Sequence, residues 1–232
     1  MSRRVQAVVL DLDDTLFDHT GSVTAALRGW LPTLGVAPSE SLVAAWFAAE
    51  ARHYPAWLAG RLTYQEQRRQ RLRDFLPLIG CAAGTDADLD DLFSGYLACY
   101  RSSWLAFGDV DAALTTIAGA GLPTAVLTNG SEDQQNAKVA AIGLRGRVGP
   151  VFTAERLGVA KPDPSTYLAV CSELAVDPSA VLHVGDQYDV DVVAARAAGL
   201  QAVHLDRRGR GPGHERRRIT SLDGLPAHLA GP

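Results

Sequence analysis

The second half of this chain alternates four times between a helix-forming segment and a short apolar segment typical of a buried strand. Three of the helical segments end at Gly121, Gly143 and Gly199, which suit the left-handed residue that commonly closes a helix. The expected elements are, in chain order, a helix over 110–120, a strand over 124–127, a helix over 132–142, a strand near 151–152, a helix over 165–174, a strand over 180–184, a helix over 190–198 and a strand over 201–204. An apolar run over 5–10 predicts one more strand, buried on both faces. Such repeats predict an α/β fold with a doubly wound, Rossmann-like parallel sheet.

The segment between the first strand and these repeats has a different pattern of apolar residues. Between about residues 20 and 103, apolar side chains recur at helical spacing and no segment predicts a strand. We therefore expect an all-helical domain inserted into a discontinuous core. The expected domains are an α/β core of residues 1–16 and 104–232 and a helical domain of residues 17–103.

Composition excludes several classes of protein. The 232 residues include 22 Lys and Arg against 26 Asp and Glu, whereas dedicated nucleic-acid binding requires a basic excess. The three cysteines form no CxxC pair, which indicates reduced thiols in a cytoplasmic protein. No secretory signal is evident, and glycines and a proline interrupt the longest uncharged stretch, residues 112–131. We expect a protein with no nucleic-acid and no membrane partner.

Ligands of an open α/β sheet bind at the carboxyl ends of its strands, so the residues that follow each strand are the candidates for chemistry. Asp11 and Asp13 follow the first strand, and an i, i+2 pair in extended chain shares one face. Two converging carboxylates repel each other unless a cation neutralises them, and hard oxygen ligands suit Mg²⁺. A helix cap or turn is the structural alternative for such a pair.

Two further motifs follow later strands. Thr128, Asn129 and Gly130 lie where a strand leads into a helix, so their hydroxyl and backbone amides could bind an anion, although the same residues are ordinary in turns. Pro162 and Pro164 follow Lys161 and restrict the backbone, and Asp163 between them can cap the helix that follows. A plain surface lysine is the alternative interpretation.

The last motif is acidic and runs from Gly185 to Asp191. Asp186, Asp189 and Asp191 follow a strand, with a glycine that permits close approach. The spacing does not match an EF-hand, which needs denser ligands and a glutamate at loop position twelve.

Together, the motifs DLDDT, TNG, KPDP and GDQYDVD resemble those of the haloacid dehalogenase-like hydrolase superfamily, specifically members with a helical cap after the first motif. The resemblance covers nearly the whole chain, and the stretch after TNG is similar to small-metabolite phosphatases and nucleotidases. It implies a Mg²⁺-dependent phosphomonoesterase that acts on a small phosphorylated metabolite through an aspartyl-phosphate. It leaves the oligomeric state open.

By this resemblance, Asp11 is the nucleophile and Asp13 the general acid and base. The expected phosphoryl-binding groups are Thr128, Asn129, Gly130 and Lys161, of which Thr128 and Lys161 count as catalytic. The expected Mg²⁺ residues are Asp11, Asp13 through its backbone carbonyl, Asp186 and Asp191, the last acting through water or by orienting Lys161. Val190 stands where members often carry Asn, which leaves the division between Asp189 and Asp191 open.

Comparison within the superfamily narrows the reaction. In the superfamily that this chain resembles, dehalogenases lack the second acid of the first motif, so the presence of Asp13 favours phosphoryl chemistry. Members that cleave phosphonates use a lysine of the cap, and the expected helical domain here contains no lysine. A sugar-phosphate mutase and a catalytically silent regulatory or scaffold member remain alternatives. Candidate specificity residues in the helical domain, each equally explained as core or solvated, are His19, His53, Tyr54, Trp57, Arg61, Tyr64 and Arg68. The arginine-rich tract 207–218 is expected to be a solvated loop, with an anion-binding patch as the alternative.

Overall fold

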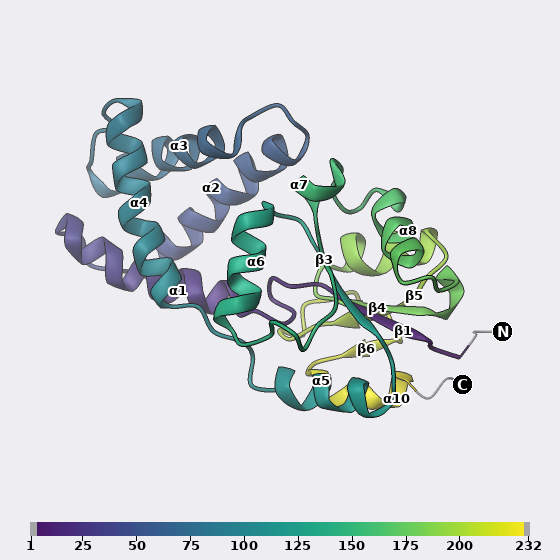
Figure 1. Cartoon of the computed structure of the whole chain (residues 1–232). Helices are drawn as coiled ribbons and strands as arrows, with labels where there is room; N and C mark the ends of the chain where they lie inside the picture. The colour runs from purple at the N-terminus through teal and green to yellow at the C-terminus, as the bar shows by residue number, and fades with distance from the viewer. Residues whose placement is uncertain (1–3, 230–232) are drawn as a thin grey trace. The chain divides into compact units, whose positions relative to one another are not determined.

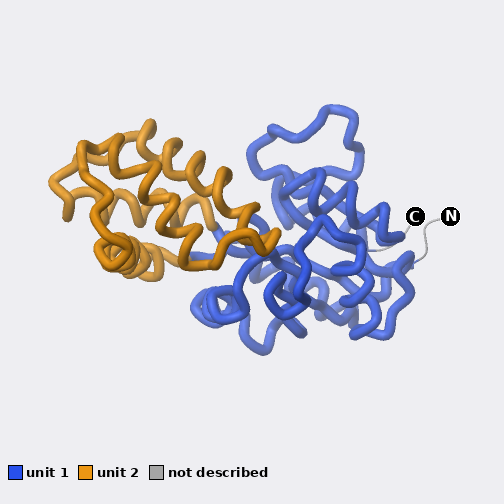
Figure 2. Tube along the Cα trace, turned by 90° about the horizontal axis from the view of Figure 1, so that it is seen from above, with its two compact units in different colours: residues 1–18, 105–232 blue, residues 19–104 orange. Residues whose placement is uncertain are grey.

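The chain forms two compact units, which we describe from a computed structural model covering residues 4–229. The first unit comprises the residues up to Asp18 and from Leu105 onward, and the second comprises His19–Trp104 (Figure 2). These limits lie one or two residues from the domain boundaries expected from the sequence. The long insertion after the first strand is thus a separate packing unit.

A parallel sheet of six strands forms the centre of the first unit. The strands are β1 (Ala7–Leu10), β2 (Thr124–Thr128), β3 (Val151–Thr153), β4 (Val181–Gly185), β5 (Gln201–Leu205) and β6 (Arg218–Ile219). Their spatial order is β3-β2-β1-β4-β5-β6, and every pairing is parallel. The predicted α/β parallel-sheet fold is confirmed. The order reverses between β1 and β4, and the carboxyl ends of strands at such a switch point form a natural ligand site.

Helices cover both faces of this sheet. They are α5 (Val110–Gly119), α6 (Glu132–Ala141), α7 (Ala154–Leu157), α8 (Pro164–Glu173), α9 (Ala194–Ala197) and α10 (Pro226–Leu229). Alternate residues of β1 and β2 pack with α8 and α9 in one apolar core. Helices α5 and α10 lie side by side beneath the sheet (Figure 1).

The structure refines two expectations about the end of the chain: the predicted helix has a different form at its start, and the arginine-rich tract is the largely exposed loop expected, with fixed contacts. The helix predicted over 190–198 is a π-helical turn, Tyr188–Val193, followed by the short α9. The arginine-rich tract leads into β6 and is fixed by buried acids: Asp206 accepts the backbone N–H groups of Arg210 and Gly211, and Glu215 pairs with Arg196. A two-residue strand is too short to produce a periodic pattern, so only its tertiary pairing identifies it.

The second unit is entirely helical. Its elements are α1 (His19–Trp30), the 3₁₀ turn Leu31–Leu34, α2 (Glu40–Leu58), α3 (Tyr64–Phe75), the 3₁₀ turn Leu76–Ile79 and α4 (Asp86–Ser102). Ser39 and Thr63 cap α2 and α3, and Thr85 with Asp88 forms a capping box at α4. Among residues 4–229, no helix is both long and apolar enough to cross a membrane.

Trp46 lies at the centre of this unit. Its side chain is fully buried. The centre of its ring lies 4.4 Å from the ring centre of Tyr96, 5.0 Å from that of Phe75 and 5.7 Å from that of Trp30. Because Trp30, Trp46, Phe75 and Tyr96 come from α1, α2, α3 and α4, this aromatic packing brings the four α-helices of the unit into one core.

We predict that Trp46→Ala lowers the free energy of unfolding by about 3–5 kcal/mol, because it removes the largest side chain from a closed core. Urea unfolding followed by circular dichroism measures the change. Leu78→Ala is the matched control, since Leu78 is 61% exposed and its loss should cost less than about 0.5 kcal/mol. Equal losses in the two variants would contradict the assignment of Trp46 to the core.

Candidate active site

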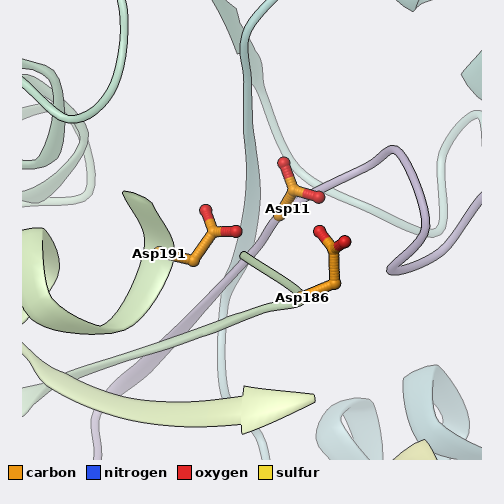
Figure 3. A group of neighbouring side chains, drawn as sticks. All are labelled: Asp11, Asp186 and Asp191. Carbon is orange, nitrogen blue, oxygen red and sulfur yellow. The ribbon is translucent and has the colours of Figure 1, made fainter. Parts of the chain in front are cut away.

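Three carboxylates meet where the strand order of the sheet reverses. Asp11 follows β1, Asp186 follows β4, and Asp191 lies in the π-helical turn Tyr188–Val193. One oxygen from each lies within 4.8 Å of the others, and Figure 3 shows the three side chains converging. Asp11 and Asp191 are buried and Asp186 is half-buried, so water screens their repulsion poorly.

The ammonium group of Lys161 lies between two of these carboxylates. Its Nζ is 2.7 Å from Asp11 Oδ1 and 2.6 Å from Asp191 Oδ1. Burial opposes the charge on Lys161, but the two carboxylates outweigh it and raise the pKa of the ammonium well above its usual range. Burial likewise works against ionisation of Asp191, yet Lys161 holds the pKa of that carboxyl well below its ordinary value. Lys161 is therefore a fixed buried cation rather than a surface lysine.

Asn129 holds Lys161 in place. The Asn129 side-chain amide donates to the Lys161 carbonyl at 2.8 Å, and its oxygen accepts the Lys161 backbone N–H at 2.8 Å. The segment after Lys161 is closed by Asp163, whose carboxylate accepts the Ser165 N–H and caps α8 as expected. The side chain of Asn129 is thus committed to joining two motifs, which leaves its backbone amide as the group that could face an anion.

Asp191 has a second set of partners besides Lys161. His183, fully buried in β4, places Nε2 3.2 Å from Asp191 Oδ1, and the Gln187 N–H donates to Asp191 Oδ2 at 3.0 Å. Burial lowers the pKa of His183. A Cβ at Gly185 would lie 2.3 Å from the Asp191 carboxyl carbon, so only glycine permits this approach. His183 was missed from the sequence because a histidine inside an apolar strand carries no motif.

Asp186 forms no ion pair with any of residues 4–229, in contrast to Asp11 and Asp191. Its Oδ1 is buried and finds no hydrogen-bond donor among residues 4–229. Burial, reinforced by the neighbouring Asp11, raises the pKa of Asp186 to about 9. Burial also raises the pKa of Asp11 to about 7, although Lys161 works in the opposite direction. An unpaired buried oxygen beside two more carboxylates is a donor set that fits a hard divalent cation such as Mg²⁺.

The Asp13 carboxylate is held apart from these three. Lys138 Nζ lies 2.6 Å from Asp13 Oδ1, and Gln135 Nε2 donates to Asp13 Oδ2 at 2.9 Å. The same Gln135 nitrogen contacts the hydroxyl of Thr128 at 2.6 Å. Both donors come from α6 and were missed from the sequence. The signals that could have revealed them are the rarity of lysine in this chain and the i, i+3 spacing after TNG.

Gly130 has a packing role in this arrangement. A Cβ at Gly130 would lie 2.6 Å from Gln135 Cγ, so the glycine makes room for the Gln135 side chain. The expected contribution of Gly130 to anion binding, through its backbone amide, remains a prediction.

The remaining candidates have contacts within their own units. Asp189 is exposed and is not among the three converging carboxylates. In the helical unit, His19 contacts Tyr100 and His53 contacts Asp74. The other candidates there form an aromatic group in which Arg68 lies 4.0 Å over Tyr64, together with Tyr54 and Trp57, while Arg61 is exposed.

The chain matches known proteins over most of its length. It is 27% identical over 204 residues to a phosphoglycolate phosphatase from Neisseria meningitidis, covering 86% of this chain and 79% of that protein. It is 29% identical over 178 residues to a phosphoserine phosphatase from Thermus thermophilus, covering 77% and 68%.

Solved structures share the fold. The HAD-hydrolase YfnB from Bacillus subtilis, solved bound to magnesium, matches with a TM-score of 0.81 at 19% identity, covering 98% of this chain and 99% of that one. A 2-haloacid dehalogenase from Pseudomonas syringae matches with a TM-score of 0.66 at 30% identity, covering 97% and 98%. The haloacid dehalogenase-like hydrolase family matches residues 5–199, and with the parallel sheet and the four motifs at its strand ends this establishes that the chain belongs to that family.

Proposed function

We propose that this protein is a Mg²⁺-dependent phosphomonoesterase that hydrolyses a small phosphorylated metabolite through an aspartyl-phosphate. One observation carries the proposal: two carboxylates two residues apart occupy separate environments, Asp11 against Lys161 and Asp13 against donors of α6. This separation suits one carboxylate to attack and the other to transfer protons. The phosphatase names of the sequence relatives support the same reaction.

In the first step, an Asp11 oxygen attacks phosphorus in line with the ester bond. The new O–P bond forms as the ester O–P bond breaks, and the leaving oxygen keeps the electron pair and takes the proton of the Asp13 carboxyl. In the second step, the Asp13 carboxylate takes a proton from water as the water oxygen attacks phosphorus. The bond to Asp11 then breaks, which releases phosphate and restores both side chains.

Positive charge at the strand ends stabilises the transferred group. Lys161 Nζ, the Thr128 hydroxyl and the backbone amides at Asn129 and Gly130 are the proposed phosphoryl-binding groups. Asp11, Asp186 and the Asp13 carbonyl would hold Mg²⁺, which when bound supplies further charge neutralisation. The contacts of Asp191 with Lys161 and Gln187 support a role in orienting Lys161 rather than direct metal ligation.

A dehalogenase is the second candidate, because solved relatives carry that name. Asp13 argues against it: a departing halide needs no proton, whereas a departing alkoxide does.

We propose residues 17–103 as the cap that selects the substrate. The free Cys81, Cys99 and Cys171 support a reducing, cytoplasmic setting.

Replacing Asp11 with Asn should lower Mg²⁺-dependent hydrolysis of 4-nitrophenyl phosphate by about 10³-fold or more, because it removes the nucleophile. Release of 4-nitrophenol measures the rate. Asp189→Asn is the matched control, since Asp189 is exposed nearby and its loss should leave the rate within about twofold. Retained activity in Asp11→Asn would refute the mechanism.

Stabilisation by Mg²⁺ should increase with pH. The pKa values of Asp11 and Asp186 are raised from 3.8 to about 7 and about 9, so the metal-free fold loses stability as pH rises from about 4 through these two values. Mg²⁺ binds the ionised carboxylates, so its effect grows over the same window. Thermal unfolding should show a larger Mg²⁺-induced shift at about pH 8.5 than at about pH 5.5, and no shift in Asp186→Asn. An equal shift at both pH values would contradict this account.

A product screen should separate the candidate reactions. We expect phosphate release from one or more small esters in a panel containing 2-phosphoglycolate, phosphoserine, glyceraldehyde 3-phosphate, sugar phosphates and nucleotides. Halide release from a 2-haloacid would instead identify a dehalogenase. Phosphate reappearing on the same sugar would identify a mutase, and absence of turnover with Mg²⁺ would identify a silent member.

A further inference from the structure

We propose that Gln135 and Lys138 are positioning residues that fix the Asp13 carboxyl group for proton transfer. The inference rests on the proposed phosphatase reaction and adds to it the requirement that α6 orient the residue that exchanges protons with the leaving oxygen and with water.

The two side chains hold both oxygens of one carboxyl group. Lys138 Nζ lies 2.6 Å from Oδ1 and Gln135 Nε2 lies 2.9 Å from Oδ2. Donors on both oxygens leave the plane of the carboxyl group little freedom to rotate. The donors are complementary to the carboxylate that remains after the proton has passed to the ester oxygen.

Neither donor occupies an ordinary surface position. Lys138 and Gln135 are each 1% exposed, although Lys and Gln are usually solvated. Their spacing of three residues places them on one face of α6, and the Lys138 ammonium lies 4.8 Å from the centre of the Phe17 ring. Phe17 pairs with Asp13 through a β-bridge, so Lys138 packs against the same loop that carries Asp13.

Gln135 also connects the proton-transfer residue to the phosphoryl-binding motif. Its Nε2 is 2.6 Å from Thr128 Oγ1, and Gly130 provides the space that its side chain fills. One amide therefore fixes the separation between Asp13 and Thr128. This separation relates the leaving oxygen to the remaining phosphoryl oxygens during transfer.

A defect in positioning should depend on the leaving group. An ester with a good leaving group, such as 4-nitrophenyl phosphate, needs little protonation, whereas an alkyl phosphate needs a proton as its bond breaks. Loss of orientation at Asp13 should therefore reduce kcat/KM most for the poorest leaving group. Because kcat/KM reports the steps up to release of the alcohol, the rate of the second step does not affect the comparison.

The test measures kcat/KM for 4-nitrophenyl, phenyl and alkyl phosphates with Gln135→Met and Lys138→Met. We expect losses of a few-fold for 4-nitrophenyl phosphate, rising to about 10–100-fold for the alkyl ester. Asn136→Met is the matched control on the exposed face of α6 and should leave all three values within about twofold. Circular dichroism and thermal unfolding check folding, and Gln135→Met, which changes no charge, serves if Lys138→Met does not fold.

A double-mutant cycle with Asp13→Asn completes the test. If Lys138 and Gln135 act through Asp13, the part of each loss that depends on the leaving group should disappear once Asp13 is Asn, whereas the contact of Gln135 with Thr128 can leave only a small loss common to all three esters. Uniform losses across the three esters, or undiminished losses in the Asp13→Asn background, would overturn the proposal while leaving the phosphatase assignment intact. A wild-type protein that releases phosphate from none of these esters would overturn both.

Discussion

The buried ammonium group of Lys161 is the interaction on which the rest of the site depends. A cation removed from water is tolerated only where anions and hydrogen bonds compensate it, and Asp11 and Asp191 supply the anions. This requirement explains the surrounding residues. Asn129 forms hydrogen bonds with both the carbonyl and the N–H group of Lys161. Because Gly185 has no side chain, the Asp191 carboxylate can pack against the backbone at Gly185. The four motifs are therefore parts of one electrostatic unit at the point where the strand order reverses.

The aspartates of the site differ in the cation that each one contacts. Asp11 contacts Lys161, Asp13 contacts Lys138, and Asp186 retains a buried oxygen without a donor among residues 4–229. Three aspartates of identical chemistry thus acquire different environments, which is the basis for the proposed roles of Asp11 in attack, Asp13 in proton transfer and Asp186 in metal binding. The chain contains two lysines, and both are buried against these carboxylates. A chain that otherwise uses arginine for its positive charge places its compact ammonium groups here.

Much of the fold could be predicted from local patterns. Glycine-closed helices alternating with apolar strands predicted the parallel sheet, and most element limits fell within one or two residues of those observed. The π-helical turn Tyr188–Val193 could not be predicted, because over six residues an α-helix and a π-helix give the same spacing of apolar side chains. Strand β6 also escaped, since two residues carry no period. Glu215 and Asp206 fix the preceding tract through contacts that no local composition reveals.

The sequence by itself determined the class of fold, the position of each motif after a strand, and the candidate residues Asp11, Asp13, Thr128, Lys161, Asp186 and Asp191. Only the tertiary structure decided which cation meets which carboxylate. Lys138 is 125 residues from Asp13 and Lys161 is 150 residues from Asp11, so no spacing rule links either pair. Their contacts depend on how α6 and the segment before α8 pack against the sheet, and on the space left by Gly130 for Gln135. The strength of an ion pair depends on the distance between the two charges and on the dielectric constant around them, and in a protein interior both are set by packing.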